Sequence, residues 1–182
     1  MLPTGHVAAG FLTAVVSVKV LKPELALAEI YQLYAWGMLF GFIPDLDEFW
    51  FFFKTKGFLV SPQSDQHHRM FFTHAPVTWL VLGGFAYWLA PNEYWKLVSL
   101  LLVLGTWSHL FLDSVEYGIM WLWPFSTKLY AFKNEGSKLA IEEKNFFKHS
   151  ILFLKIYSKH LSFYLEVVII LIAILTAINL IS

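Results

Sequence analysis

The sequence contains no cysteine and few charged residues, and these two absences exclude several classes of protein. Without cysteine the chain cannot form disulfides, thiolate zinc sites or a cysteine nucleophile, so any metal must be held by histidine and carboxylate. Charged residues make up only 14% of the 182 residues and hydrophobic residues 58%, whereas soluble domains are about 25% charged. We therefore do not expect a soluble enzyme.

The charges that are present balance, which argues against nucleic acid as a partner. The chain has 13 Lys and Arg against 13 Asp and Glu, so its formal net charge is zero. No basic run with interleaved aromatic residues suggests a groove for nucleic acid. Binding of nucleic acid is therefore not expected.

Several stretches without charge are apolar enough to cross a membrane as helices, which requires about 20 mostly apolar residues for a full span. They are residues 2–18, 30–44, 70–92, 97–112 and 167–182. Short polar turns at 19–24 and 91–93 predict two antiparallel helical hairpins. We predict an all-α integral membrane bundle of about five transmembrane helices. A soluble all-α domain with unusually apolar helices is the alternative.

The polar segments do not divide the chain into two domains. We expect one membrane-embedded domain over residues 1–182, with a core at 1–125 that carries the motifs described below. Residues 126–182 then form an interfacial segment and a final transmembrane helix.

Ionisable residues gather near the ends of the predicted helices. Two antiparallel hairpins bring the start of the first helix, the end of the second, the start of the third and the end of the fourth to one membrane face. The residues at these ends are His6, Asp45, Asp47, His67, His68, His74, His109 and Asp113. Such side chains near a bilayer are costly and usually functional, although each one taken singly can be an ordinary polar residue at a helix end.

The spacing of these residues favours a metal site at that face. His109 and Asp113 are four residues apart, so both lie on one helix face and can bind a single cation. Asp45 and Asp47 follow Pro44 at the end of a helix, where the backbone can leave helical geometry and both carboxylates can point toward a metal. Alternatively, an aspartate here forms the N-cap of the next segment. Imidazoles with carboxylates suit Zn, Mn or Fe better than Ca, and suffice for two ions that share a carboxylate.

Other polar residues admit two interpretations. Arg69 can clamp a phosphate oxygen, or it can extend to the membrane interface as a snorkelling arginine. Thr73 can cap the third helix. We expect His149 and His160 to be solvated residues at helix ends, and most Trp and Phe side chains to face lipid or the interface.

Four motifs in order resemble the serial motifs of the membrane-bound metal-dependent hydrolases, the YdjM-like family of prokaryotic membranes. They are GHVAAG at 5–10, PDLD at 44–47, HR and THA within 68–75, and HLFLD, Gly118 and WPF within 109–125. The resemblance covers about the first 125 residues. In one respect the chain departs from the family: three residues separate Arg69 from Thr73 where the family has two, which leaves His67 and His68 as alternative ligands.

The order of these residues is also similar to that in zinc-dependent phospholipase C and the single-strand nucleases of its fold. That resemblance implies one metal among Asp45, a histidine of the 67–74 segment, His109 and Asp113, and a second metal where His6 joins Asp113. The chain has no histidine shortly after Asp113 and no later His-x3-Glu, so the third metal of those enzymes is not expected.

These resemblances imply a role for each candidate residue. The metal ligands are His6, Asp45, His68, His109 and Asp113, with His74 as a further ligand or outer partner. Asp47 then orients a ligand or acts as general base. Two divalent ions, Zn or alternatively Mn or Fe, would lower the pKa of bound water toward neutrality.

The expected function is hydrolysis of an ester, with a phosphoester of a lipid or lipid-linked molecule as the favoured substrate. A site at the interface can receive a headgroup while the tail stays in the bilayer. The alternative is a non-enzymatic metal-binding membrane protein or a metal transporter. A transporter would spread its ligands near the membrane midplane, whereas these residues cluster at one end.

Basic residues predict the orientation in the prokaryotic inner membrane. The site face carries eight and the opposite face three: Lys54, Lys56, Arg69, Lys128, Lys133, Lys138, Lys144 and Lys148 against Lys19, Lys22 and Lys96. Positive residues in short loops favour the cytoplasm. We therefore expect a cytoplasmic site.

Overall fold

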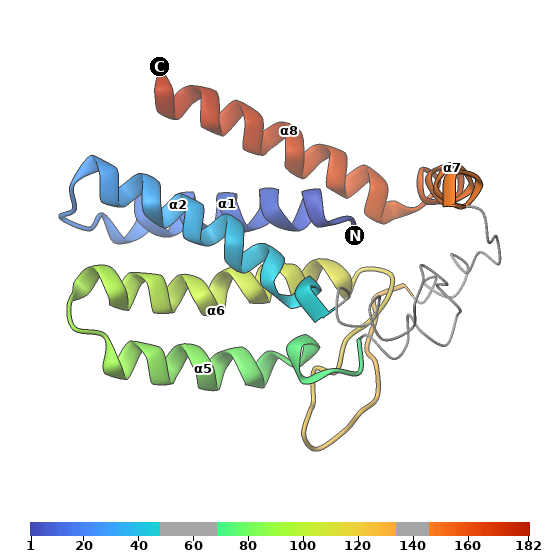
Figure 1. Cartoon of the computed structure of the whole chain (residues 1–182), viewed down its shortest axis with the longest axis horizontal. Coiled ribbons are helices and arrows are strands. Elements are labelled where there is room, and N and C mark those ends of the chain that lie inside the picture. Colours follow the sequence, from blue (N-terminus) through green and yellow to red (C-terminus); the bar gives the residue numbers. More distant parts are fainter. Residues whose placement is uncertain (48–68, 134–145) are drawn as a thin grey trace.

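The protein is a bundle of helices, most of which lie side by side along one axis (Figure 1). The computed structural model describes residues 1–47, 69–133 and 146–182. Its helices are α1 (Pro3–Leu21), α2 (Leu27–Phe42), α5 (Pro76–Leu89), α6 (Glu93–Asp113), α7 (Phe146–Tyr157) and α8 (Leu161–Ile181), with the 3-10 turns η1 (Ile43–Asp45) and η2 (Phe72–His74). No strand occurs among these residues, where the one isolated bridge pairs Ile119 with Tyr130. The predicted all-α class is confirmed.

Two antiparallel hairpins form the centre of the bundle, as predicted. α1 and α2 make the first, and α5 and α6 the second, with both turns at the same end of the molecule (Figure 1). The first turn begins at Lys22, which adopts a left-handed conformation with φ of 46°. At the second turn the Asn92 side chain accepts a hydrogen bond from the Trp95 N–H at 3.1 Å and caps α6. The opposite end therefore holds the start of α1, the end of α2, the start of α5 and the end of α6.

Glycines let α1, α2 and α6 approach closely near that opposite end. A Cβ atom added to Gly10 of α1 would lie 2.1 Å from the Gly37 carbonyl oxygen of α2. A Cβ at Gly41 would lie 2.3 Å from the carbonyl oxygen of His6, and one at Gly105 of α6 would lie 2.9 Å from the Phe40 Cβ. Small residues at these crossings allow backbone contact that larger side chains would block. This contact brings His6 beside the end of α2.

Among the residues that the structure describes, three helices are long and apolar enough to cross a membrane: α1, α6 and α8. α8 packs against α1, and much of its remaining surface is apolar and exposed. α5 is apolar but has 14 residues, which at about 1.5 Å per residue is shorter than the hydrocarbon core. α2 has 16 residues. Five transmembrane helices therefore stay a prediction, whereas three candidate spans are observed.

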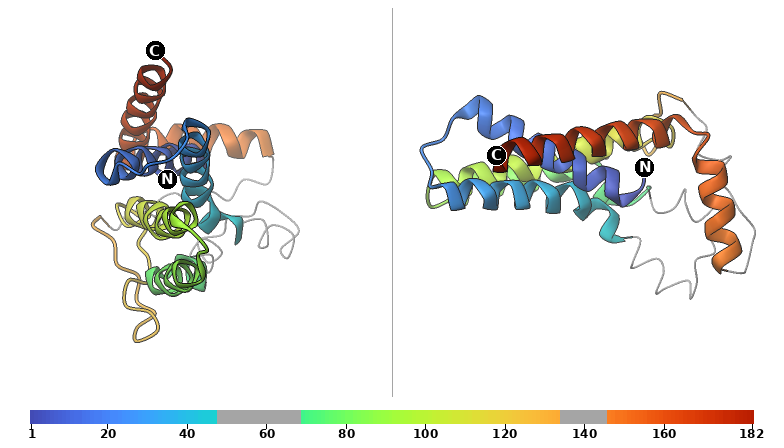
Figure 2. Two further views of the ribbon diagram at one scale, coloured as in Figure 1. Left: turned by 90° about the vertical axis from the view of Figure 1, so that its left-hand side faces the viewer. Right: turned by 90° about the horizontal axis from the view of Figure 1, so that it is seen from above.

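The described segment after α6 and helix α7 lie at the end of the bundle opposite the turns (Figure 1). After α6 the chain folds back so that the Phe132 N–H donates to the Ser114 carbonyl oxygen at 2.7 Å. α7 lies crosswise to α8 at this end, as Figures 1 and 2 show. The interfacial segment before the last helix stays a prediction.

Candidate metal centre

Five of the predicted site residues meet in the interior at this end of the bundle. His6 lies in the first turn of α1, Asp45 in η1 and His74 in η2, while His109 and Asp113 lie in the last turns of α6. All five are buried. They form two overlapping groups whose ligand atoms lie within 4.8 Å of one another, namely His6, His109 and Asp113, and Asp45, His74 and His109.

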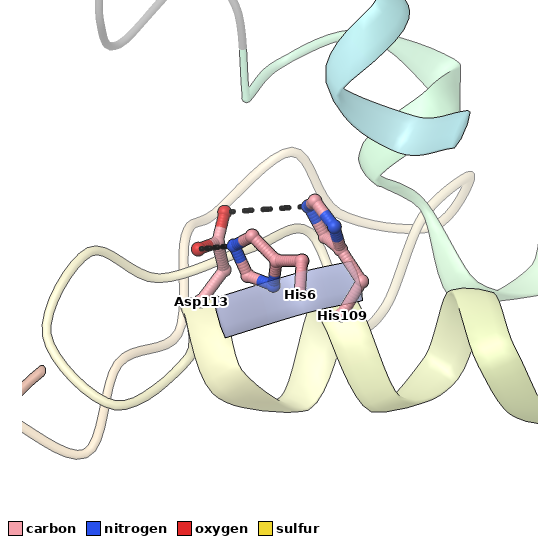
Figure 3. A group of neighbouring side chains, drawn as sticks. All are labelled: His6, His109 and Asp113. Carbon is pink, nitrogen blue, oxygen red and sulfur yellow. Dashed lines mark ion pairs between the residues drawn. The ribbon is translucent and has the colours of Figure 1, made fainter. Parts of the chain in front are cut away.

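The first group is shown in Figure 3. His6 Nε2 lies 3.3 Å from Asp113 Oδ1, and His109 Nε2 lies 3.8 Å from Asp113 Oδ2. The His6 and His109 rings stack with their centroids 3.7 Å apart. The spacing of four residues thus places the side chains of His109 and Asp113 close together, and His6 joins them.

The second group shares His109 with the first. His109 Nε2 lies 3.3 Å from Asp45 Oδ1, and the His74 ring centroid lies 5.6 Å from that of His109. The same nitrogen of His109 therefore faces both carboxylates. Since one lone pair binds one ion, His109 can serve only one of the two groups at a time.

Outer hydrogen bonds set the orientation of two histidines. His109 Nδ1 lies 2.8 Å from the Gly41 carbonyl oxygen, which can only accept, so Nδ1 carries a proton and Nε2 is the nitrogen that can offer a lone pair to an ion. His74 Nδ1 lies 3.3 Å from Asp47 Oδ2, and the Thr73 hydroxyl donates to the same oxygen. This arrangement matches the outer partners of metal-binding histidines, which fix the ring and leave the other nitrogen for the ion.

The donor atoms of the first group fit a cation. Within the described parts of the chain, neither ring nitrogen of His6 nor Nε2 of His109 makes a hydrogen bond, although His6 is only 1% exposed and His109 fully buried. Buried polar atoms are nearly always satisfied, so these nitrogens are unusual. A divalent ion beside Asp113 would satisfy Nε2 of His6 and Nε2 of His109, and a mixed imidazole and carboxylate set suits Zn, Mn or Fe.

The electrostatics at Asp45 favour the ionised carboxylate. Burial by itself raises the pKa of Asp45, but the neighbouring His109 outweighs this effect, so the pKa lies below its ordinary value of 3.8. Asp45 is therefore a carboxylate at neutral pH, which is the form that binds cations.

Arg69 is buried in the site beside Asp113, which favours a role in the site over the snorkelling alternative. Its side chain is about 9% exposed, and its Nε lies 3.4 Å from Asp113 Oδ2. The guanidinium carbon lies 3.9 Å above the centre of the Tyr117 ring, which holds it in a cation–π contact. Asp113 also lies 3.0 Å from the α-amino group of Met1. A positive charge thus stands beside the ligand cluster.

Two further expectations differ from the structure. Thr73 does not cap the third helix, because α5 begins at Pro76 with Ala75 as N-cap and the Thr73 hydroxyl binds Asp47 instead. His160 is not solvated, because it is buried with Nδ1 3.5 Å from Glu116 Oε2. His67 and His68 lie outside the described residues, so the choice between them, and the ligand role of His68, stay predictions. The His149 side chain also lies outside them.

Sequence reasoning missed two buried acids beside the site. Glu116 accepts hydrogen bonds from the N–H groups of Leu161 at 3.0 Å and Ser162 at 3.1 Å, at the start of α8. Glu166 of α8 accepts from the Gly5 N–H at 3.2 Å and from the Tyr157 hydroxyl at 2.5 Å. Both carboxylates therefore sit at helix N-termini, where negative charge is stabilised. The sequence signal for Glu166 is an acid in an otherwise apolar stretch.

Comparison with known proteins identifies the family of this chain. A search of curated proteins found no match, and neither did a search of solved structures. The profile of the YdjM inner membrane protein family matches residues 1–181, nearly the whole chain. This match, together with three apolar helices long enough to span a bilayer, indicates membrane localisation. The chain belongs to the YdjM inner membrane protein family.

Proposed function

We propose that this protein is a membrane-bound metal-dependent hydrolase that acts on a phosphoester of a lipid or lipid-linked molecule. The observation that carries the proposal is the buried cluster of His6, His109 and Asp113, in which imidazole nitrogens without hydrogen bonds face a carboxylate. Asp45 and His74 extend the cluster, so the chain offers ligands for one ion or two. Zn fits this set best, and Mn or Fe are alternatives.

The chain's own residues would prepare the site for this chemistry. When bound, a divalent ion would supply a Lewis acid and an activated water. The Gly41 carbonyl and Asp47 would hold His109 and His74 in the tautomers that ligate through Nε2. The contact of Asp47 with His74 favours this positioning role over that of a general base. His68 stays a further candidate ligand.

Arg69 favours a phosphoester over a neutral ester. Its guanidinium stands beside Asp113 and is oriented by Tyr117, so its fork of donors can bind an anionic oxygen of a substrate near the metal ligands. The cluster lies at helix ends, where a headgroup could reach it while a tail stays in the bilayer. The excess of basic residues in the loops at this end favours the cytoplasmic face of the inner membrane, with about five helices crossing it.

A metal transporter or a metal-stabilised scaffold is the alternative. Transport sites lie near the bilayer midplane, at interrupted helices. Here the ligands lie at the ends of helices, and α1 and α6 run without interruption from one end of the bundle to the other. This placement favours the enzyme.

Metal analysis beside a hydrolysis assay tests the proposal. The protein would be purified in detergent, its metal content measured by mass spectrometry, and its activity assayed on a chromogenic phosphodiester before and after chelation. We expect at least one tightly bound divalent ion per chain, and hydrolysis that chelation abolishes and added Zn restores. Protein that binds metal without hydrolysing phosphoesters would be a transporter or scaffold, and protein that binds no metal would overturn the proposal.

A further inference from the structure

An apolar groove runs beside the ligand cluster, between three helices. It has a volume of about 430 Å³, within the usual range of about 300–1,000 Å³ for ligand sites. α1 contributes Ala9 and Thr13, α6 contributes Ser108 and Leu112, and α8 contributes Ile169, while Trp121 follows α6. These three helices are the ones long enough to cross the membrane, so the groove lies where lipid hydrocarbon surrounds the protein.

The polar side chains of the groove are already hydrogen-bonded within the protein. The Thr13 hydroxyl donates to the Ala9 carbonyl oxygen at 2.8 Å, and the Ser108 hydroxyl to that of Gly105 at 2.7 Å. The indole N–H of Trp121 donates to Ser114 at 2.8 Å. These polar hydrogens are therefore committed to the protein, and the groove presents a hydrocarbon-like surface to a ligand.

The groove begins next to the candidate metal ligands. Ala9 lies one turn along α1 from His6, a rise of about 4.5 Å. On α6, Ser108 and Leu112 are the chain neighbours of His109 and Asp113. The groove thus lies within about one helical turn, along α1 and α6, of the residues His6, His109 and Asp113, and Arg69 lies 3.4 Å from Asp113.

From this arrangement we infer that the groove binds one hydrocarbon chain of an amphiphile whose anionic phosphate head lies at Arg69. The charge of Arg69 complements the head, and the apolar lining complements the tail. The inference rests on the proposed function and specifies its substrate class as a phosphate ester with a long alkyl or acyl chain. A second chain, where the lipid has one, stays in the bilayer.

Photolabelling of the full-length protein in detergent tests the groove without an activity readout. The probe is hexadecyl phosphate that carries a diazirine along its chain, and the competitor is unmodified hexadecyl phosphate. We expect adducts to concentrate in residues 9–13 and 104–112 and to disappear with competitor. Inorganic phosphate, which lacks the chain, should compete poorly. Adducts spread evenly over the exposed face of α8, or adducts that the competitor does not displace, would overturn the inference.

A pair of variants on α1 distinguishes binding in the groove from binding at the lipid-facing surface. Thr13→Trp fills the groove, whereas Val16→Trp places the same bulk on a side chain that is 59% exposed. We expect Thr13→Trp to lower competed labelling by about tenfold, comparable to the loss of roughly two buried methylene groups. Val16→Trp should label like the wild type. Equal labelling of both variants would contradict the inference, and circular dichroism would show whether Thr13→Trp keeps its helices.

Failure of the groove and failure of the proposed function give different results. Competed labelling of the groove in a protein that hydrolyses no phosphoester supports the groove and overturns the enzyme. Hydrolysis of a chain-free phosphoester without competed labelling supports the enzyme and overturns the groove. If the protein both hydrolyses phosphoesters and binds the chain in the groove, Thr13→Trp should raise KM for the long-chain ester more than Val16→Trp does.

Discussion

His109 is the residue on which the candidate centre depends most, because it belongs to both ligand groups. We expect His109→Ala and Asp113→Ala each to lose bound metal and to lower hydrolysis by more than about 100-fold, beyond the effect of losing an outer partner. The protein should still insert in the membrane, since its apolar helices are unchanged. Metal content is measured on purified protein, with Glu93→Gln at the distant turn as control. Wild-type metal content in both alanine variants would disprove the site assignment.

Asp47 is expected to behave differently from the ligands. Asp47→Asn keeps a hydrogen-bonding side chain but removes the charge that faces His74 Nδ1. We expect metal affinity to fall by about 10- to 100-fold, as for other outer partners, while saturating metal restores most of the activity. Titration with a competing chelator measures the affinity. Activity that stays lost at saturating metal would instead indicate that Asp47 is a general base.

Among the elements, the crossing of α1 and α2 positions His6. Gly41→Ala would place a Cβ 2.3 Å from the His6 carbonyl oxygen, so the helices must separate. We expect a loss of about 1–3 kcal/mol of stability, typical of overpacking, together with weaker metal binding. Gly84→Ala on α5 is the matched control, because a Cβ there meets nothing within 4 Å. Alanine at that helical position should leave stability unchanged or raise it by up to about 1 kcal/mol. Thermal unfolding in detergent would test both, and equal midpoints would refute the close-packing argument.

The start of α8 is expected to respond to pH through Glu116. Burial alone would raise the pKa of Glu116, but hydrogen bonds donated by Ser162 and Leu161 outweigh it and hold the pKa below the ordinary value of 4.5. A carboxyl whose pKa is lowered on folding stabilises the folded state above its unfolded pKa. That contribution is lost as the pH falls through the lower, folded-state pKa.

Glu116→Gln tests this contribution. At neutral pH we expect the variant to lose about 1 kcal/mol, a typical cost of removing a helix cap. The difference in melting temperature from the wild type should shrink as the pH falls below 4.5. A difference that stays constant down to pH values near 3, well below the ordinary pKa of glutamate, would show that Glu116 stabilises α8 by packing and not by charge.

For the whole molecule, the unequal basic charge predicts which end faces the cytoplasm. Lys128 lies in the loop after α6 at the cluster end, and Glu93 lies at the opposite turn; both are exposed. Because the chain has no native cysteine, Lys128→Cys and Glu93→Cys each introduce a single thiol. With a membrane-impermeant reagent on intact cells, we expect labelling at position 93 and protection at position 128. The opposite pattern would place the cluster outside the cytoplasm.

Local sequence patterns were enough to predict much of the helical framework. Runs without charge located α1, α2, α5, α6 and α8 to within several residues, and short polar turns gave both hairpins. Helix ends were less well placed, as at Thr73, because a hydroxyl that can cap a helix can also bind a carboxylate from another segment. The candidate centre was largely foreseen for a topological reason: two antiparallel hairpins must bring alternate helix ends together.

What the sequence by itself determined is whatever depends on neighbours along the chain: the helices, the hairpins, and the shared helix face of His109 and Asp113. Only the tertiary structure decided which partner each polar group meets. It buried Arg69 over Tyr117, turned Asp47 toward His74, and placed Glu116 at the start of α8. The groove likewise exists only where three helices meet. Helix periodicity is encoded over a few residues, whereas such contacts join segments far apart in the chain, whose approach depends on packing of the whole bundle.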